Sequence, residues 1–507
     1  MKKTRFPFLL AILLVPCALL LNGATLFSER FSERGFSRSR WLEEHEVLRN
    51  ARGDVEEPPA ARPKQGNQAP VVSVPGLAPA ATNFRVSSDL LQAARDGSQP
   101  ETETEPYIAV NPEREGHLLA AYQEGRYSEG GARALTWAVS FDGGRTWEEG
   151  LIPHLSLTAG GPFERVSDPW VAFGLGDRAY YVTLAFNETS APNGIFVSSS
   201  SDGGLTWGEP VTVHLGGADF DDKEAIIVDT YPDSPFRGRV YVAWDTVTTD
   251  RRQPPLFSYS TNDGASFRQA TTLDSSAPAL GTIPLVLPGG AVVVIWLRGT
   301  GNNVQVVAAR STDGGNTWSA PFPIAAPHAA GIAGSRTGDG LPSAAVDAVT
   351  GDLYVTWQDD RFSRGVDQAV LSRSSDGGRT WSAPQQVSDG PLQLPNFTPA
   401  VAVTAEGQVG VVYYSTRNDP ARRLLLDEYL AVSSDHGVSF GPSRRLSATS
   451  WDPSFAAFSR GLFLGDYQGL AGGRHAFHPL WIATFNASRI APSIRQPDAF
   501  TRPVKAP

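Results

Sequence analysis

The sequence is almost free of sulfur. Of its 507 residues only Cys17 is a cysteine and only Met1 is a methionine. A single cysteine excludes an intrachain disulfide framework, a cysteine-based zinc site and an iron–sulfur cluster. If the first two dozen residues are removed on export, the remaining chain has no sulfur to oxidise.

Positive charge is also scarce. The chain has 43 basic and 53 acidic residues, which gives a formal net charge of -10. Such a balance argues against a surface that neutralises phosphates and against binding to an anionic membrane surface. We therefore expect no nucleic-acid partner.

The apolar run that stands out is at the N-terminus. Lys2, Lys3 and Arg5 precede an uncharged stretch from 6 to 27, the layout of a bacterial-type secretory signal over 1–24. Two alternatives are an uncleaved membrane anchor and lipid attachment at Cys17, which the preceding Pro16 disfavours. We expect export to the periplasm or the exterior, with any membrane tether through this segment alone. Residues 25–82 mix charges with Pro/Ala-rich runs and are expected to form a disordered linker.

Glycine, proline and tryptophan are abundant, with 50, 39 and 12 copies, a composition typical of turn-rich β proteins. The octet Ser-x-Asp-x-Gly-x-Thr-Trp occurs at 140–147, 200–207, 311–318 and 374–381, with degenerate copies at 260–267 and 433–440. In such an octet the Asp carboxylate accepts backbone N–H groups, Gly supplies positive φ and Trp anchors the next strand. The octet therefore predicts a hairpin turn with a structural role, repeated at a spacing that leaves room for four strands.

The octet resembles the Asp-box, or BNR, repeat of the sialidase-like (neuraminidase-like) β-propellers, and the resemblance covers nearly all of the chain from residue 83 onward. It implies an all-β propeller of four-stranded antiparallel blades over 83–507. Three features favour seven blades. The chain has six octets, a further set of strand patterns follows Gly465, and a strand-like segment at 83–88 is expected to close the last blade. Six blades are the alternative.

Charged residues concentrate where the loops of such a propeller meet its axis, on the face opposite the octet turns. Carboxylates head the expected inner strands, as Glu105, Asp168, Glu224 and Asp466. Arginines follow an aromatic residue at one fixed spacing in three repeats, as Arg126, Arg361 and Arg417.

Sialidases hold the substrate carboxylate with three arginines, attack with a tyrosine and protonate the leaving group with an aspartic acid. The resemblance thus implies Arg126, Arg361 and Arg417 as substrate-binding residues, Tyr467 with Asp466 beside it as the nucleophile site, and Asp168 or Glu105 as acid/base. It implies an exo-alpha-sialidase-type glycoside hydrolase that acts on an acidic glycan or glycoconjugate. The Phe-Arg-Ile-Pro segment that marks the first sialidase arginine is absent, which favours the alternative, a non-catalytic propeller that binds a glycan or a protein.

One acidic cluster could ligate a metal. Its sequence, Asp219-Phe220-Asp221-Asp222-Lys223-Glu224, offers oxygen ligands of the kind Ca²⁺ takes. We expect no other metal and no organic cofactor, and we expect a monomer.

Overall fold

The computed structural model describes residues 83–91, 97–190, 192–338, 340–489 and 496–507. The predicted signal segment and linker, 1–82, lie outside these residues. In the described part, antiparallel strands dominate and helix is confined to three short 3₁₀ turns, η1 (Leu157–Ala159), η2 (Gly301–Asn303) and η3 (Pro453–Phe455). Across these residues we find no helix with the length and apolar character that a membrane span requires.

The strands form successive four-stranded sheets in chain order. The first three sheets are β2 (Glu103–Val110), β3 (Leu118–Arg126), β4 (Ala132–Ser140) and β5 (Glu148–Leu151); β6 (Arg165–Phe173), β7 (Ala179–Phe186), β8 (Asn193–Ser200) and β9 (Val211–Leu215); and β10 (Phe220–Val228), β11 (Val240–Val247), β12 (Pro255–Ser260) and β13 (Thr271–Thr272). A single bridge, Ala132 to Val166, joins the first sheet to the second.

Three further sheets repeat the plan. They are β14 (Ala279–Val286), β15 (Val292–Arg298), β16 (Gln305–Ser311) and β17 (Phe322–Ala325); β19 (Ser343–Val346), β20 (Leu353–Asp359), β21 (Gln368–Ser374) and β22 (Gln385–Gln386); and β23 (Asn396–Val403), β24 (Val409–Ser415), β25 (Asp427–Ser433) and β26 (Arg444–Arg445).

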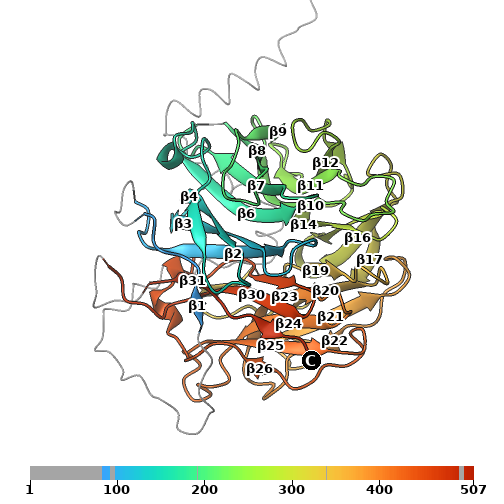
Figure 1. Cartoon of the computed structure of the whole chain (residues 1–507). Helices are drawn as coiled ribbons and strands as arrows, with labels where there is room; N and C mark the ends of the chain where they lie inside the picture. Colours follow the sequence, from blue (N-terminus) through green and yellow to red (C-terminus); the bar gives the residue numbers. More distant parts are fainter. Residues whose placement is uncertain (1–82, 92–96, 191, 339, 490–495) are drawn as a thin grey trace, which may run out of the picture.

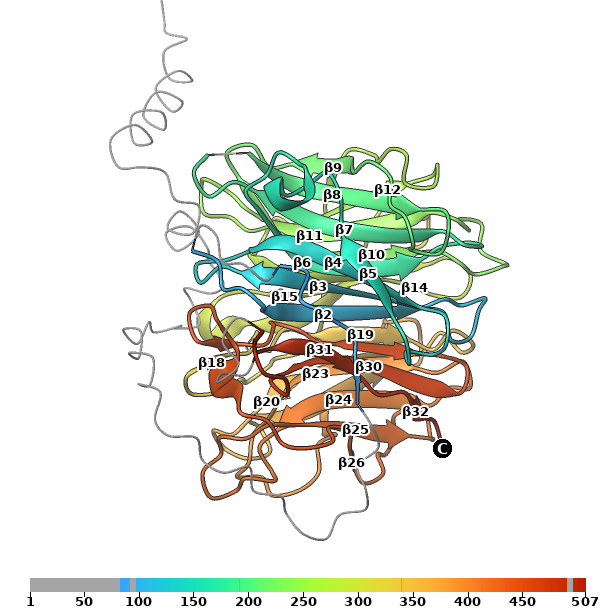
Figure 2. The same cartoon turned by 60° about the vertical axis from the view of Figure 1, so that its left-hand side comes forward.

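The last sheet combines the two ends of the described chain. It contains β29 (Gly469–Gly472), β30 (Ala476–Ala483), β31 (Asp498–Thr501) and the short β32 (Val504–Lys505), and β1 (Phe84–Arg85) pairs antiparallel with β31. Figures 1 and 2 show blue β2 beside red β30 and β31, although these strands come from opposite ends of the sequence, and their residues are in contact.

The first strands of successive sheets contact one another around a common axis. β2 contacts β6, and the contacts continue through β10, β14, β19, β23 and β29 back to β2. The sheets pack face to face through large side chains on their second strands, among which Trp244, Trp296, Trp357 and Trp481 are fully buried. This arrangement is a β-propeller.

The octet turns carry out the structural role that their residue types predict. In the first copy, Asp142 Oδ1 accepts the backbone N–H groups of Arg145 and Thr146, and Thr146 Oγ1 donates to Asp142 Oδ2 at 2.7 Å. Desolvation acts to raise the pKa of Asp142, but these hydrogen bonds outweigh it and lower the pKa to about 2. The carboxylate is therefore fully engaged in the turn.

A small sheet lies apart from this plan. β27 (Ala457–Phe458) pairs with β28 (Leu462–Phe463), and β28 also pairs in parallel with β18 (Ser335–Arg336). The side chain of Gln99 holds this hairpin through both backbone groups of Phe458, with its Nε2 donating to the carbonyl and its Oε1 accepting the N–H, each at 2.7 Å.

Candidate functional site

The site begins with a backbone irregularity that recurs in the first strands. The pairing register of β2, β6 and β10 with their second strands is interrupted by a bulge. At each bulge stands a non-glycine residue with positive φ: Glu105 (51°), Asp168 (50°) and Lys223 (53°). Non-glycine residues at positive φ are sterically strained, and strained backbone conformations are concentrated at functional sites.

The carboxylates of Glu105 and Asp168, together with that of Asp466, meet at the ammonium group of Lys223. Its Nζ lies 2.7 Å from Asp168 Oδ1, 2.9 Å from Asp466 Oδ2 and 3.4 Å from Glu105 Oε1. The four side chains are at most 5% exposed. One lysine thus joins carboxylates from three other segments of the chain.

Two arginines complete the cluster. Arg336 of β18 binds both carboxylate oxygens of Asp466, with its Nε donating to Oδ1 at 2.8 Å. Arg126 of β3 donates to Ser459 Oγ at 3.1 Å, and both guanidinium groups lie over the ring of Phe463, at 4.6 and 4.7 Å from its centroid. The hairpin of β27 and β28 therefore adds its own residues to the cluster. We call Glu105, Asp168, Lys223, Asp466, Arg126 and Arg336 the axial cluster.

The surroundings shift the pKa values of two carboxyl groups of the axial cluster in opposite directions. Burial raises the pKa of Glu105 to about 7, although Lys223 opposes the shift. Burial also acts to raise the pKa of Asp168, but its closer contact with Lys223 outweighs this and lowers the pKa below its usual range. Burial lowers the pKa of Arg126 to about 10; Glu105 opposes that shift and Arg336 adds to it.

A cavity of about 50 Å³ adjoins Lys223. Its wall includes Tyr107 and Trp170, whose rings stack with centroids 3.6 Å apart, and Tyr467, which meets Trp170 edge-on at 5.4 Å. The Tyr467 hydroxyl donates to the carbonyl of Pro169 at 3.2 Å, and burial raises its pKa well above the usual value. Tyr467 and Asp466 precede β29, so they lie in the loop and not in the strand that the sequence predicts.

The three arginines expected to form one clamp have separate partners in the described structure. Arg361 binds Asp359, two residues before it, and the carbonyl of Ala326. Arg417 binds Asp389 at 2.6 Å and stacks on Tyr429 at 4.0 Å. Arg126 alone reaches the axial cluster. A nearby acid neutralises each of the other two, which is why the shared spacing in the sequence does not bring the three groups to one carboxylate.

Sequence reasoning placed Glu224 at the head of its strand, where the structure has Lys223. Glu224 is 2% exposed, neither carboxylate oxygen has a hydrogen-bond partner in the described residues, and burial raises its pKa well above the usual value. The signal that could have identified Lys223 is its alignment with Glu105 and Asp168, each directly before the residue that opens the apolar strand. No sequence pattern pointed to Arg336.

The expected calcium cluster is divided among different partners. Asp221 accepts hydrogen bonds from Trp244 Nε1 and Thr246 Oγ1 and pairs with His214 Nδ1 at 2.8 Å, whereas Asp219 accepts the N–H of Thr249. In the described structure the carboxylates of Asp219 and Asp221 are thus held by separate partners.

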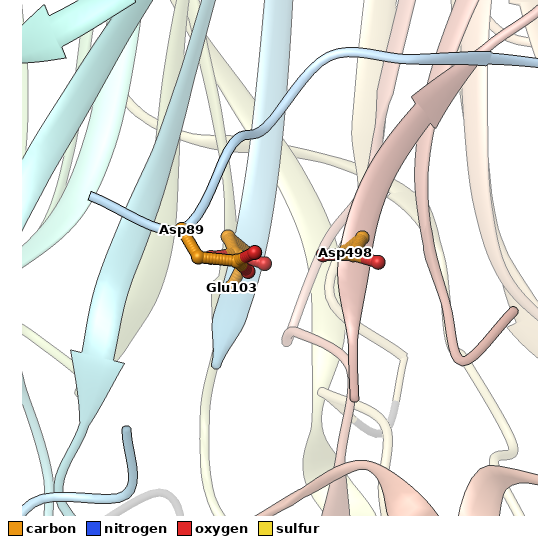
Figure 3. A group of neighbouring side chains, drawn as sticks. All are labelled: Asp89, Glu103 and Asp498. Carbon is orange, nitrogen blue, oxygen red and sulfur yellow. The ribbon is translucent and has the colours of Figure 1, made fainter. Parts of the chain in front are cut away.

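A different acidic group gathers beside β1. Within the described ranges, Asp89, Glu103 and Asp498 are the one group of three or more acidic, histidine or cysteine side chains whose ligand atoms all lie within 4.8 Å of one another. Figure 3 shows them on the loop after β1, on β2 and on β31. Arg85 Nη2 binds both Asp89 and Asp498, so a guanidinium stands where a cation would bind, and the group joins β1 to the last sheet.

Comparisons with known proteins give partial similarities. No protein-family model matches the chain. A sialidase from Bacteroides fragilis (strain YCH46) is 34% identical over 103 residues, which span 17% of this chain and 19% of that protein. The chain thus matches about a fifth of the length of this curated relative.

Among similar solved structures is a Hadza microbial sialidase, with 14% identity and a TM-score of 0.44 over 77% of this chain and 73% of that chain. Another is the Trypanosoma rangeli sialidase in complex with the inhibitor DANA, with 14% identity and a TM-score of 0.42 over 67% of this chain and 54% of that chain. A third is the alpha-L-arabinofuranosidase of Fusarium graminearum in complex with arabinobiose, with 14% identity and a TM-score of 0.43 over 66% of this chain and 93% of that chain.

Proposed function

We propose that this chain is an exported, sialidase-like glycoside hydrolase built on a seven-bladed propeller that β1 closes. The continuous contacts from β2 through β29 back to β2 support the ring, and the pairing of β1 with β31 supports the closure. Closure of this kind removes the exposed edge that a linear array of sheets would leave.

The observation that carries the proposed activity is that Glu105 and Asp168 both lie against one lysine, 3.4 and 2.7 Å from Lys223 Nζ, in surroundings that shift their pKa values in opposite directions. Both carboxylates contact Lys223 Nζ, so their nearest oxygens are no more than about 6 Å apart. This limit is compatible with the separation of about 5 to 5.5 Å at which retaining glycosidases hold their two carboxyl groups. In this proposal Glu105 is the proton donor, and Asp168 is the ionised group that stabilises the positive charge developing on the sugar.

The neighbouring side chains fit an acidic sugar. Arg126 supplies a planar, charged donor group that matches a carboxylate, whereas Arg336 is paired with Asp466 and positions that carboxylate. Both guanidinium groups lie over the ring of Phe463. Tyr467, which lines the adjoining cavity with Trp170, keeps the role of candidate nucleophile beside Asp466.

One observation favours the second candidate function, a non-catalytic propeller that binds a glycan. Lys223 is paired with three carboxylates at once, and a lysine held in this way can serve simply to fix the axial ends of the blades. In that case the axial cluster is structural, and recognition takes place at another surface.

The test is hydrolysis of a fluorogenic sialoside beside a panel of other fluorogenic glycosides. We expect release from an acidic glycoside, with a loss of at least about a hundredfold in kcat for Glu105→Gln and Asp168→Asn, the usual contribution of a general acid or base. Arg361→Ala is the matched control because its guanidinium lies in a local pair outside the cluster. Release from none of the glycosides, together with glycan binding that survives both substitutions, would support the second candidate.

A further inference from the structure

Two arginines from neighbouring sheets approach each other over a glycine. Arg310 lies near the end of β16, and Arg379 lies in the octet turn of the following sheet. A Cβ atom at Gly377 would lie 3.9 Å from Arg310 Nε and 3.7 Å from Arg379 Nη1. Arg310 Nε and Arg379 Nη1 are therefore no more than about 8 Å apart, and Gly377, which has no side chain, lies beside both nitrogens.

Neither guanidinium has an acidic partner. Within the part of the chain that the structure describes, no carboxylate forms an ion pair with Arg310 or Arg379, and Arg310 Nε has no hydrogen-bond partner. The nearby Asp376 is already engaged, because its Oδ1 accepts the N–H groups of Arg379 and Thr380 and its Oδ2 accepts the Thr380 hydroxyl. Arg379 Nη1 donates only to the Asp376 carbonyl, at 2.6 Å.

Arg379 is exposed and Arg310 is partly buried, in a chain with ten more acidic than basic side chains. Burial lowers the pKa of Arg310, and the charge of Arg379 lowers it further. An anion between the two groups would remove this repulsion and supply the missing acceptors.

We propose that the notch formed by Arg310, Gly377 and Arg379 binds an oxyanion, the carboxylate or sulfate group of an acidic ligand. Two guanidinium nitrogens within this limit of about 8 Å can donate charge-assisted N–H···O bonds of about 2.8 Å to different oxygens of one such group. The ligand class is the same for carboxylate and sulfate because both present paired oxygens to a guanidinium fork.

This notch is separate from the axial cluster and does not depend on the proposed activity. Leu287, which directly follows β14, lies 3.4 Å from the Cβ position of Gly377, whereas the bulge of β14 is at the start of the strand, between Leu280 and Ile283. The notch is thus at the opposite end of the blade from the bulges that carry the axial cluster.

The first octet provides a matched control. A Cβ at Gly143 would lie 3.9 Å from Arg145 Nη1, as at Gly377, but its other neighbour is the backbone of Gly116 instead of a second arginine. Arg145 Nη1 donates to the Asp142 carbonyl at 2.7 Å, just as Arg379 does in its own turn. Arg145→Ala therefore removes an equivalent charge from an equivalent turn without changing the notch.

The experiment is calorimetric titration of the purified protein with sodium sulfate, sodium acetate and sodium chloride at constant ionic strength. We expect binding of sulfate or acetate in the millimolar range, and whichever binds more tightly identifies the group preferred. Arg310→Ala and Arg379→Ala should each weaken binding by about tenfold, the loss of one charge-assisted hydrogen bond, whereas Arg145→Ala leaves it unchanged. Arg310→Lys should restore part of the loss.

Crystals soaked in selenate give a second measurement, since the anomalous signal of selenium locates the anion. A peak between Arg310 and Arg379 is expected. Absence of oxyanion binding, equal loss in Arg145→Ala, equal affinity for chloride, or a selenate peak only at other places would each overturn the proposal.

Discussion

Lys223 and Asp466 are 243 residues apart in the sequence, yet Lys223 Nζ lies 2.9 Å from Asp466 Oδ2. The lysine comes from the bulge of β10, and the aspartate comes from the loop before β29. Their contact ties the middle of the chain to its C-terminal sheet across the axis.

Removing this lysine should cost stability, because it leaves carboxylates buried without a cation. Breaking a buried pair by deleting one partner costs about 3 to 5 kcal/mol, and we expect Lys223→Met to lower the free energy of unfolding by at least this amount. Urea denaturation measures the change. Arg114→Ala is the control, since Arg114 and Asp177 form a pair that is about half exposed; it should leave stability nearly unchanged, and an equal effect of the two substitutions would contradict the role given to Lys223.

The dependence of stability on pH should reveal the buried acids. Burial raises the pKa of Glu124 to about 8, with contributions from Glu149 and Asp89, although the N–H of Leu91 opposes the shift. A carboxyl group with a folded pKa above its unfolded value stabilises the fold fully below the unfolded pKa, and this stabilisation is lost as the pH rises through the folded value. Between pH 5 and about 8, wild type should therefore lose stability relative to Glu124→Gln.

The measurement is the free energy of unfolding of both proteins across this range, and the difference should be on the order of a few kcal/mol. Gln is a suitable replacement because its carbonyl can still accept the N–H of Leu91, which Glu124 Oε1 accepts at 2.9 Å. Parallel pH profiles for the two proteins would show that Glu124 is ionised in the fold.

The octet aspartates should contribute to stability and not to activity. Asp376→Ala removes the acceptor of two backbone N–H groups, and we expect a loss of about 1 to 2 kcal/mol with no change in any glycosidase activity. Asp376→Asn should cost less, because Asn262 holds the third octet in the same way, with its Oδ1 accepting the N–H of Ser266 at 3.1 Å. Thermal unfolding of the two variants checks the order.

Truncation should test the role of β1. A chain that starts at residue 83 keeps β1, whereas one that starts at residue 91 loses β1 and Arg85, the cation that binds Asp89 and Asp498. We expect the shorter chain to unfold at a clearly lower temperature. In that chain β31 becomes an edge strand without β1, and the buried carboxylate of Asp498 on β31 loses Arg85. Equal melting temperatures would contradict closure of the ring by this strand.

The repeating part of the protein follows from local sequence patterns. The octet places Asp, Gly and an aromatic residue at fixed positions, and hydrogen bonds within a few residues suffice to form its turn, so the turns and the all-β class follow from local chemistry. The sequence also predicts carboxylates at the heads of the inner strands; of these, Glu105, Asp168 and Asp466 lie in the axial cluster, whereas Glu224 does not.

The set of side chains that meet at the axis depends on how distant sheets pack together. Sequence spacing could not show that Arg361 and Arg417 pair with nearby acids, or that Arg336 reaches Asp466 from a strand 130 residues away. The bulges also determine which side chains face the axis. At the bulge of β10, Lys223 has positive φ and takes the place that the sequence predicts for its neighbour Glu224. Such choices depend on contacts between distant sheets, which no local pattern records.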